Sequence, residues 1–420
     1  MNYKYMSKNA FYSQSGGVTS VINTTASAVI LEAKKSKKIN KVFAGKNGIL
    51  GALNEELYDT SVESTSFIKD LKFRPGGVFG SCRYKLKDFS KNQKEYQRII
   101  DVFRAHDIGY FFYNGGNDSA DTALKISEAC KKLNYDLNCI AIPKTVDNDL
   151  AVTDCCPGFG SVAKYVINST IEAALDVESM AASSTKVFIL EVMGRHAGWI
   201  AASSAVAIES YPHAPDLILL PEITFKERDF LRKVKDTVAS KGFCVVVASE
   251  GIKNNKGRFI AESGLKDAFG HSQLGGVAPT LANIISKKTG LKNHWAVADY
   301  LQRSARHIAS GVDLDQAFAV GKHAVKYASK NMHGVMPVIK RLSNNPYKWT
   351  IEPASLKKIA NVEKKLPASF ITKDGYGITK KGIAYFKPLI SGKLEHKFSS
   401  MPKYKKGKLK LVKKKLPLWV

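Results

Sequence analysis

Residues 143–149, Pro-Lys-Thr-Val-Asp-Asn-Asp, directly follow the apolar run Cys-Ile-Ala-Ile at 139–142. The run predicts a buried strand, and the polar heptad is then the loop at the carboxyl end of that strand. Ligands of open α/β sheets bind at such loops. The heptad holds one cation and two carboxylates, and a phosphoryl-transfer site needs a cation for a phosphate and a base for a hydroxyl. Taken alone, it could equally be a solvated turn, because Asp and Asn are common turn residues.

Two glycine-rich loops come earlier in the chain. Gly16 and Gly17 open a helical pattern, and paired glycines at a helix start let backbone N–H groups approach an anion. An ordinary strand-to-helix turn would have the same sequence, so this pair says little by itself. Three glycines and a proline at 75–80 force a second loop, which leads to Arg83. The Arg83 guanidinium suits a phosphate, although a surface Arg beside a loop is commoner.

The next loop also follows a predicted strand. Residues 108–113 form an apolar run that continues into Asn-Gly-Gly-Asn-Asp-Ser at 114–119, and a helix is predicted from there to about residue 133. Asn117 and Asp118 offer oxygen ligands for Mg²⁺, while Asp118 and Ser119 would also serve as helix caps. This loop and the one at 143–149 are both acidic, and both follow predicted strands. Two such loops in succession are less expected by chance than one, which favours a functional role for the pair.

The chain after residue 150 repeats the pattern of strand, loop and helix. Lys186 precedes a predicted strand at 187–192, which runs into Met193, Gly194 and Arg195. An Arg at a strand-to-helix junction is a candidate phosphate clamp, or else a capping or ion-pairing side chain.

Two more strands are predicted at 217–220 and 243–248. The second is followed by Glu250, which could accept hydrogen bonds from a sugar hydroxyl or be an exposed acid in a turn. A cationic cluster at 300–307 includes Tyr300 and Arg303, and residues 312–328 then favour a helix.

The composition is that of a globular protein with a strong positive charge. The 420 residues carry 64 Lys and Arg against 37 Asp and Glu, a net charge of +27. This balance favours acidic partners such as phosphorylated metabolites, nucleic acid or an anionic membrane, and a generally lysine-rich proteome would explain it equally well. The lysine-rich end at 403–415 is interpreted as a solvated, strand-like extension, with a polyanion-binding arm as the less favoured alternative.

No apolar run has the length of a membrane span, and residues 1–14 lack the apolar core of a signal peptide. The six cysteines form no C-x-x-C pair and no zinc-like spacing. We therefore expect a cytoplasmic protein with reduced thiols and no membrane partner.

Taken together, seven of these pieces resemble the phosphofructokinase family, in particular its pyrophosphate-dependent branch. They occur in the family's order over roughly residues 10–330 and are Gly16-Gly17 with Asn23, Gly76-Gly77 with Arg83, 115–119, 143–149, Met193-Gly194-Arg195 with Gly198, Ser249-Glu250-Gly251, and Tyr300 with Arg303. The resemblance implies an α/β fold of two doubly wound, Rossmann-like domains with the active site in the cleft between them. Residues 1–150 would bind the phosphoryl donor, with the chain returning at about 306–340. Residues 151–305 would bind the sugar phosphate, and 341–420 would be a basic C-terminal extension.

The activity that the resemblance implies is reversible phosphoryl transfer from Mg-pyrophosphate to the 1-hydroxyl of fructose 6-phosphate. Asp147 would be the base for the hydroxyl proton, and Asp149 would lie close to the metal. The donor would face Gly16, Gly17 and Arg83. The residues expected to hold the sugar phosphate are Thr145, Val146, Asp147, Lys186, Met193, Gly194, Arg195, Glu250, Tyr300 and Arg303. In the family, the basic residue at the position of Lys186 sometimes serves the neighbouring subunit, and a homodimer or homotetramer is expected.

Asp118 and Lys144 are the two positions that favour pyrophosphate as the donor, and both are expected to act in catalysis. ATP-dependent members resemble one another in having Gly at the position of Asp118 and a small residue at that of Lys144. A carboxylate at 118 would repel the α-phosphate of ATP, and Lys144 would stabilise pyrophosphate and the leaving phosphate.

Asn117 stands where many members carry Asp, and would hold Mg²⁺ through its carbonyl oxygen or through a bridging water. An ATP-dependent sugar kinase on the same fold is the alternative function. A non-catalytic polyanion-binding protein is a more remote one, and no nucleic-acid partner is expected.

Overall fold

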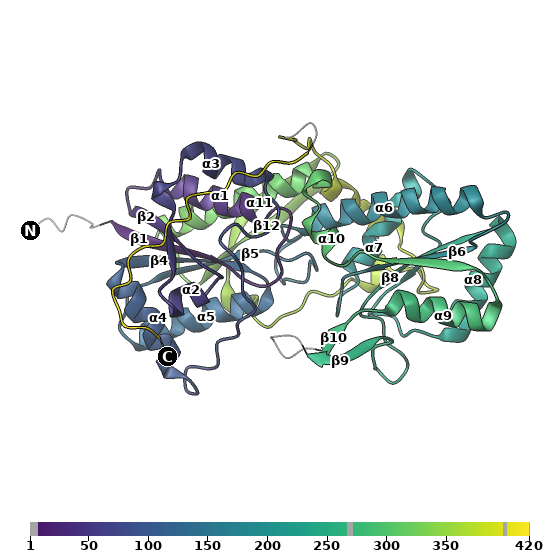
Figure 1. The fold of residues 1–420 in the computed structure, drawn as a ribbon, viewed down its shortest axis with the longest axis horizontal. Coiled ribbons are helices and arrows are strands. Elements are labelled where there is room, and N and C mark those ends of the chain that lie inside the picture. Colours follow the sequence, from purple (N-terminus) through teal and green to yellow (C-terminus); the bar gives the residue numbers. More distant parts are fainter. Residues whose placement is uncertain (1–6, 267–271, 398–400, 420) are drawn as a thin grey trace, which may run out of the picture.

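The computed structural model of the chain describes residues 7–266, 272–397 and 401–419. Two α/β halves lie end to end, each built around its own sheet (Figure 1). Both halves have helices on the two faces of a largely parallel sheet, so the predicted fold class is confirmed. No helix within the described ranges is both long enough and apolar enough to cross a membrane.

The larger sheet has seven strands in the order β13-β12-β5-β4-β1-β2-β3. Its five inner strands are parallel, and an antiparallel strand lies at each edge. The strands are β1 (Lys8–Gln14), β2 (Ile39–Gly45), β3 (Leu57–Asp59), β4 (Ile108–Gly115), β5 (Asn138–Pro143), β12 (Val335–Asn344) and β13 (Tyr347–Ser355). The predicted strands at 108–113 and 139–142 are therefore confirmed as β4 and β5.

Helices cover both faces of this sheet because successive strand residues point to opposite sides. Along β1, Tyr12 packs into the core that α1 (Ile22–Ala33) and α11 (Gly311–Ser329) cover, whereas Phe11 packs into the opposite core. There the Phe11 ring lies 5.3 Å from that of Phe103 on α4 (Gln93–Ala105), next to α5 (Asn117–Lys132). Figure 1 shows the two helix pairs on either side of the sheet.

The strand order of the larger sheet reverses next to β1. The chain proceeds from β1 outward to β2 and β3, and then returns to β4 and β5 on the other side of β1. At such a switch point the crossovers diverge, which leaves a crevice at the carboxyl ends of the strands. The loops that follow β1, β4 and β5 open into this crevice.

The smaller sheet has four parallel strands in the order β11-β6-β8-β7, which reverses between β6 and β11. Its strands are β6 (Val187–Val192), β7 (Leu217–Leu219), β8 (Cys244–Ser249) and β11 (Asn293–Val297). Its helices are α6 (Phe159–Met180), α7 (Trp199–Ser203), α8 (Glu227–Lys241), α9 (Val277–Thr289) and α10 (Asp299–Ser304). A two-stranded antiparallel ribbon, β9 (Glu262–Lys266) with β10 (Ser272–Leu274), lies beside this half.

The C-terminal region begins inside the larger half and not at its surface. The boundary predicted at residue 341 falls within β12, which pairs with β5 and forms a hairpin with β13. Beyond the hairpin, the rings of Phe370 and of Phe386 on α12 (Lys380–Phe386) each lie 6.2 Å from Trp199. The expectation of a separate extension from 341 is thus corrected. It failed because exposed and half-buried residues alternate along the outer part of β12, so the apolar pattern fades there.

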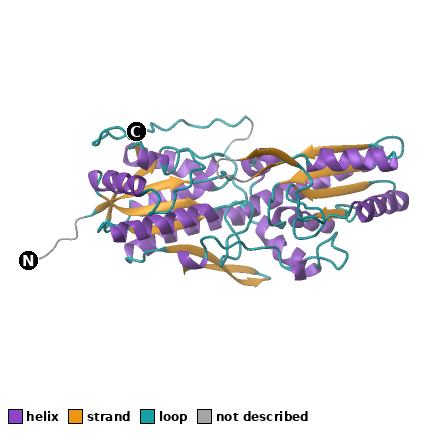
Figure 2. Cartoon of the chain, turned by 90° about the horizontal axis from the view of Figure 1, so that it is seen from below, coloured by secondary structure: helices purple, strands orange, loops and turns teal. Residues whose placement is uncertain are grey.

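The lysine-rich end of the chain runs back across the larger half as an extended stretch (Figures 1 and 2). The Asp59 N–H donates to the carbonyl of Lys410 at 2.9 Å, and the Val412 N–H donates to the carbonyl of Leu57 at 2.8 Å. These bonds cover the outer edge of β3, which would otherwise present unpaired backbone groups.

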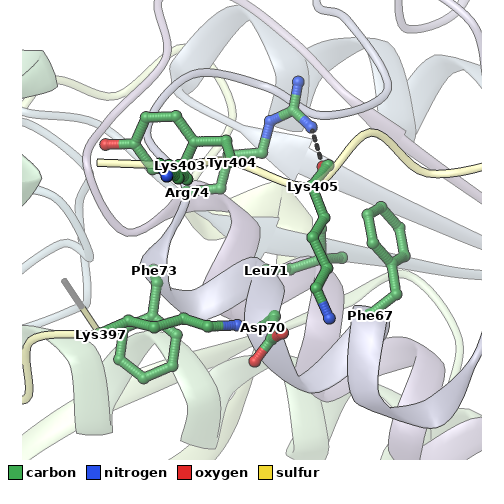
Figure 3. A pocket seen from close by; sticks show the side chains of 9 residues that line it. All are labelled: Phe67, Asp70, Leu71, Phe73, Arg74, Lys397, Lys403, Tyr404 and Lys405. Carbon is green, nitrogen blue, oxygen red and sulfur yellow. Dashed lines mark hydrogen bonds and ion pairs between the residues drawn. The ribbon is translucent and has the colours of Figure 1, made fainter. Parts of the chain in front are cut away.

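An earlier part of this stretch crosses α3 (Thr65–Asp70) and the turn after it (Figure 3). Arg74 donates a hydrogen bond to the carbonyl of Lys405 at 3.2 Å, and the ammonium of Lys397 contacts the carboxylate of Asp70. The space enclosed there is only about 20 Å³, so these side chains serve to attach the chain end.

Candidate active site

A cleft of about 870 Å³ lies where the carboxyl ends of the two sheets face each other. The predicted residues that line it are Gly16, Gly17, Arg83, Asn117, Asp118, Lys144, Thr145, Val146, Asp147, Asp149, Met193, Arg195, Glu250, Tyr300 and Arg303. Most of them meet because their loops follow strands of one of the two sheets at or near its switch point. Arg83 instead follows a turn after α3, and a bridge between Ser15 and Cys82 holds its loop beside the end of β1.

Lys144 ties three loops of the larger half together. Its side chain is only 4% exposed, and its Nζ donates to the carbonyl of Gly17 at 2.7 Å. Its backbone N–H donates to the carbonyl of Gly115 at 3.1 Å. Burial, reinforced by the nearby Arg303, lowers the pKa of Lys144 to about 8. A bound anion would favour the charged form of this amine.

Asp147 and Asp149 place two carboxylates at the floor of the cleft. The Asp147 N–H donates to Thr145 Oγ1 at 3.1 Å, which shapes the loop. Burial, with Asp149 and Glu250 nearby, raises the pKa of Asp147 to about 7. A carboxylate with such a pKa is suited to act as a general base near neutrality. Burial also raises the pKa of Asp149, whose Oδ1 has no hydrogen-bond partner in the described part of the chain.

Asn148, between the two aspartates, fixes the bend of the loop. Its backbone is left-handed at φ 55°, a conformation that Asn tolerates better than most residues. Its buried side chain accepts a hydrogen bond from the Cys156 N–H at 3.0 Å and donates one to the Tyr385 hydroxyl at 3.1 Å. The two carboxylates on either side are thereby turned toward the cleft.

Glu250 lies in the opposite wall, after β8, and Gly194 supports it from the loop after β6. The Glu250 N–H donates to the carbonyl of Val192 at 2.9 Å, and its Oε1 accepts from the Gly194 N–H at 3.3 Å. Burial raises the pKa of Glu250. Gly194 does not itself line the cleft but holds Glu250, whose carboxylate faces it.

Arg303 reaches across to the larger half. Its guanidinium stacks 3.7 Å from the centre of the Tyr300 ring. A Cβ at Gly17 would lie 2.6 Å from one Arg303 nitrogen and 4.0 Å from Arg83, so both guanidinium groups lie over the Gly17 loop. Arg303, which the family resemblance assigns to the sugar phosphate, is therefore also close to the loop expected to bind the donor.

Asp118 and Asn117 occupy the first turn of α5, at the edge of the cleft. Lys85, a cleft residue that the sequence did not indicate, has its Nζ 3.3 Å from Asp118 Oδ1. The side-chain Oδ1 of Asn117 accepts a hydrogen bond from the Asn361 N–H at 2.7 Å. The side-chain NH₂ group of Asn117 donates to the backbone carbonyl of Val362 at 2.9 Å. The amide that was expected to hold the metal is thus already oriented by the C-terminal region.

Lys186 is the predicted residue that the structure places elsewhere. It precedes β6, whereas Met193 follows the same strand at the cleft. A strand of this length separates the two positions by roughly 20 Å. The Lys186 ammonium donates to the nearby Ala181 carbonyl. It therefore lies away from the cleft of its own chain. Its expected role at the sugar 6-phosphate, which in the family sometimes falls to the neighbouring subunit, stays a prediction.

Several further cleft residues were not predicted from the sequence, among them Asn361, Glu363 and His196. Asn361 and Glu363 come from the C-terminal region, and Glu363 Oε1 lies 2.7 Å from Nδ1 of His196. His196 directly follows Arg195 and could have been inferred from its neighbour. Asn361 and Glu363 lie far along the chain from every glycine-rich loop, and nothing in their local sequence marks them.

Comparison with known proteins is in keeping with this geometry. The sequence pattern of the phosphofructokinase family matches residues 9–328. The chain belongs to the phosphofructokinase family. The pyrophosphate–fructose 6-phosphate 1-phosphotransferase of Xanthomonas campestris is 57% identical over 414 residues, which cover 98% of this chain and 99% of that protein. The protein of the same name from Methylococcus capsulatus is 58% identical over 386 residues, 92% of each chain.

A solved structure of this family has the same fold over nearly its full length. The pyrophosphate-dependent phosphofructokinase from Nitrosospira multiformis superposes with a TM-score of 0.90 at 52% identity. The match covers 98% of this chain and 100% of that one, so the C-terminal region beyond residue 328 is shared as well.

Proposed function

We propose that the chain transfers a phosphoryl group from pyrophosphate to the 1-hydroxyl of fructose 6-phosphate. The observation that carries this proposal is the buried Lys144 ammonium, which lies beside the Gly17 loop and the Asp147 carboxylate in one cleft. Such a fixed cation can neutralise the charge that develops on the leaving phosphate when pyrophosphate splits. The names of the relatives that are 57% and 58% identical agree with this donor and this acceptor.

The carboxylate of Asp147 is the base in this mechanism. It accepts the proton of the sugar 1-hydroxyl while the hydroxyl oxygen attacks the near phosphorus of pyrophosphate. A new P–O bond forms to the sugar, the bridging P–O bond breaks, and inorganic phosphate leaves. Because the pKa of Asp147 is raised to about 7, the carboxylate can accept this proton and also return it in the reverse reaction.

The donor is held by cations and backbone N–H groups of the larger half. Gly16 and Gly17 allow close approach at the end of β1, and Gly16 has φ 76°, which favours glycine. Arg83, Lys144 and Arg303 surround that loop and would neutralise the charge that builds up on the leaving phosphate. In phosphoryl transfer such positioning and charge neutralisation supply most of the rate.

The sugar would lie against the opposite wall. Thr145 and Val146 border the reacting hydroxyl from the catalytic loop, while Glu250 and Met193 offer a carboxylate and an apolar surface from the smaller half. Arg195 and Tyr300, which also line the cleft, would bind the sugar and its 6-phosphate. Lys186 would reach this phosphate only from a neighbouring subunit, which is consistent with a homodimer or a homotetramer.

The residues around Asp149 fit a bound Mg²⁺. Its buried Oδ1 lacks a partner among the described residues, as expected of an oxygen that accepts a cation. Across all the residues that the structure describes, no group of three or more His, Cys, Asp or Glu side chains is arranged to hold a metal ion by itself. Mg²⁺ commonly binds through one or two carboxylates plus phosphate oxygens and water. We propose Asp149 as its direct ligand and the carbonyl of Asn117 as a contact through water; the ion would neutralise phosphate charge.

A pair of assays tests the donor. Purified enzyme is given fructose 6-phosphate and Mg²⁺ with either pyrophosphate or ATP, and we expect turnover with pyrophosphate. Replacing Asp118→Gly together with Lys144→Gly should lower kcat/KM for pyrophosphate about 100-fold and raise the relative use of ATP. Binding of fructose 6-phosphate, measured by calorimetry, is the control for folding. Turnover of the native enzyme with ATP and none with pyrophosphate would overturn the proposal.

A further inference from the structure

Four residues of the C-terminal region, 361–364, contact three of the segments that line the cleft: the start of α5, the catalytic loop at 143–149 and the loop after β6. They lie outside the span 9–328 that the family pattern covers. The first contact is with the donor side. Asn361 and Val362 bind the Asn117 amide at 2.7 and 2.9 Å, and the Asn361 NH₂ group donates to Asp121 at 2.9 Å. Together these bonds fix the first turns of α5, which carry Asp118.

The second contact is with the catalytic loop. The Lys364 N–H donates to the carbonyl of Asp149 at 2.7 Å. The Lys364 ammonium donates to the carbonyls of Thr153 and Asp154 at 2.9 and 2.8 Å, and lies 3.5 Å from Asn148 Oδ1. One side chain therefore holds both the bend between the two aspartates and the segment that follows it. Its charge is met by carbonyl dipoles, so its truncation would leave several acceptors without a donor.

The third contact is with the loop that carries the sugar-binding residues. Glu363 Oε1 lies 2.7 Å from Nδ1 of His196. The Trp199 indole N–H donates to the carbonyl of Lys364 at 2.9 Å, and the Lys364 ammonium lies 5.0 Å from the centre of the Trp199 ring. Since Trp199 is buried, the segment is anchored to the body of the smaller half.

We propose that residues 361–364 act as a clasp that holds the start of α5, the catalytic loop and the loop after β6 in the relative positions needed for in-line transfer, with Lys364 as the main positioning residue. The inference rests on the proposed function. Its physical basis is that an in-line reaction tolerates little displacement of its partners, and a shift of about 1 Å can cost about 100-fold in rate. Lys364 touches the catalytic loop from behind, so its loss should impair the reacting geometry more than substrate binding.

Lys364→Met tests the clasp, with the adjacent exposed Lys365→Met as the matched control. We expect Lys364→Met to lower kcat about 100-fold while KM for pyrophosphate and for fructose 6-phosphate each change less than about threefold. Lys365→Met should behave as the native chain. Lys364→Arg, which keeps the charge and the donors, should recover kcat to within about tenfold. A Lys364→Met enzyme with kcat within about twofold of the native value would overturn the proposal.

Two further measurements test the clasp, one that does not depend on enzyme activity and one for the case in which Lys364→Met does not fold. Hydrogen exchange of peptides that cover residues 144–150 should be faster in Lys364→Met than in Lys365→Met, and this readout needs no activity. Unchanged exchange would contradict the clasp even if the proposed reaction were wrong. If Lys364→Met does not fold, Glu363→Gln replaces it and should lower kcat about threefold to tenfold at constant KM; native kcat in that variant would count against the clasp.

Discussion

Two aspartates whose pKa is raised by loss of solvent, one in the cleft and one at the junction of α11 with α6, show that a raised pKa does not by itself mark a functional carboxylate. Asp313 is 1% exposed and accepts hydrogen bonds from the N–H groups of Gly158 and Ser161 and from the Ser161 hydroxyl at 2.9, 3.0 and 2.6 Å. Burial raises its pKa to about 6 against these bonds. Asp147 instead has two carboxylates, Asp149 and Glu250, among its neighbours, and its pKa is raised to about 7. Asp313, whose carboxylate is surrounded by hydrogen-bond donors, is therefore assigned a structural role. Asp147, whose neighbours include two other carboxylates, is assigned the reactive one.

The largest effect is expected from Asp147→Asn. Removal of the base should lower kcat about 1,000-fold. The folded-state pKa lies above the ordinary value of 3.8, so this group favours folding below about pH 4, and the contribution is lost as the pH rises through about 7. At about pH 8 the variant should therefore be more stable than the native chain, by roughly 1–2 kcal/mol.

Steady-state kinetics and urea denaturation at that pH check both halves of this prediction. Loss of activity together with loss of stability would mean that Asp147 is structural like Asp313, and the comparison would break down.

Asp313→Ala should give the opposite outcome. Three donors lose their acceptor in a packed junction, which should lower the free energy of unfolding by about 2–4 kcal/mol. The kcat of the folded fraction should stay within about twofold of the native value, because the side chain lies outside the cleft. The exposed Asp315→Ala, two residues further along α11, is the control and should change stability by less than about 0.5 kcal/mol. Thermal unfolding and active-site titration measure the two effects, and a large loss of kcat in Asp313→Ala would contradict the assignment.

The sequence predicted the cleft loops better than the parts that hold them. Strands such as β5 and β6 are short apolar runs that end in glycine or polar residues, so the pattern of each run places its loop at the carboxyl end. The same logic cannot find Lys364, because its role depends on carbonyls more than 200 residues away in the chain. The sequence places Asp147 in a loop at a strand end, but it does not show that carboxylates surround Asp147 whereas hydrogen-bond donors surround Asp313, since those surroundings arise only when distant segments pack.

The pH dependence of the reaction gives the finest test of the difference between the two aspartates. If Asp147 must be deprotonated to accept the hydroxyl proton, kcat/KM in the direction of sugar phosphorylation should fall about tenfold per unit below about pH 7. Glu250→Gln removes a like charge and should move this acidic limb of the pH profile of kcat/KM to lower pH. Lys144→Met removes an opposite charge and should move it to higher pH. Asp313→Ala should leave the limb in place, because it is remote from the base. Shifts of Glu250→Gln and Lys144→Met in the same direction would show that the limb reports a group other than Asp147.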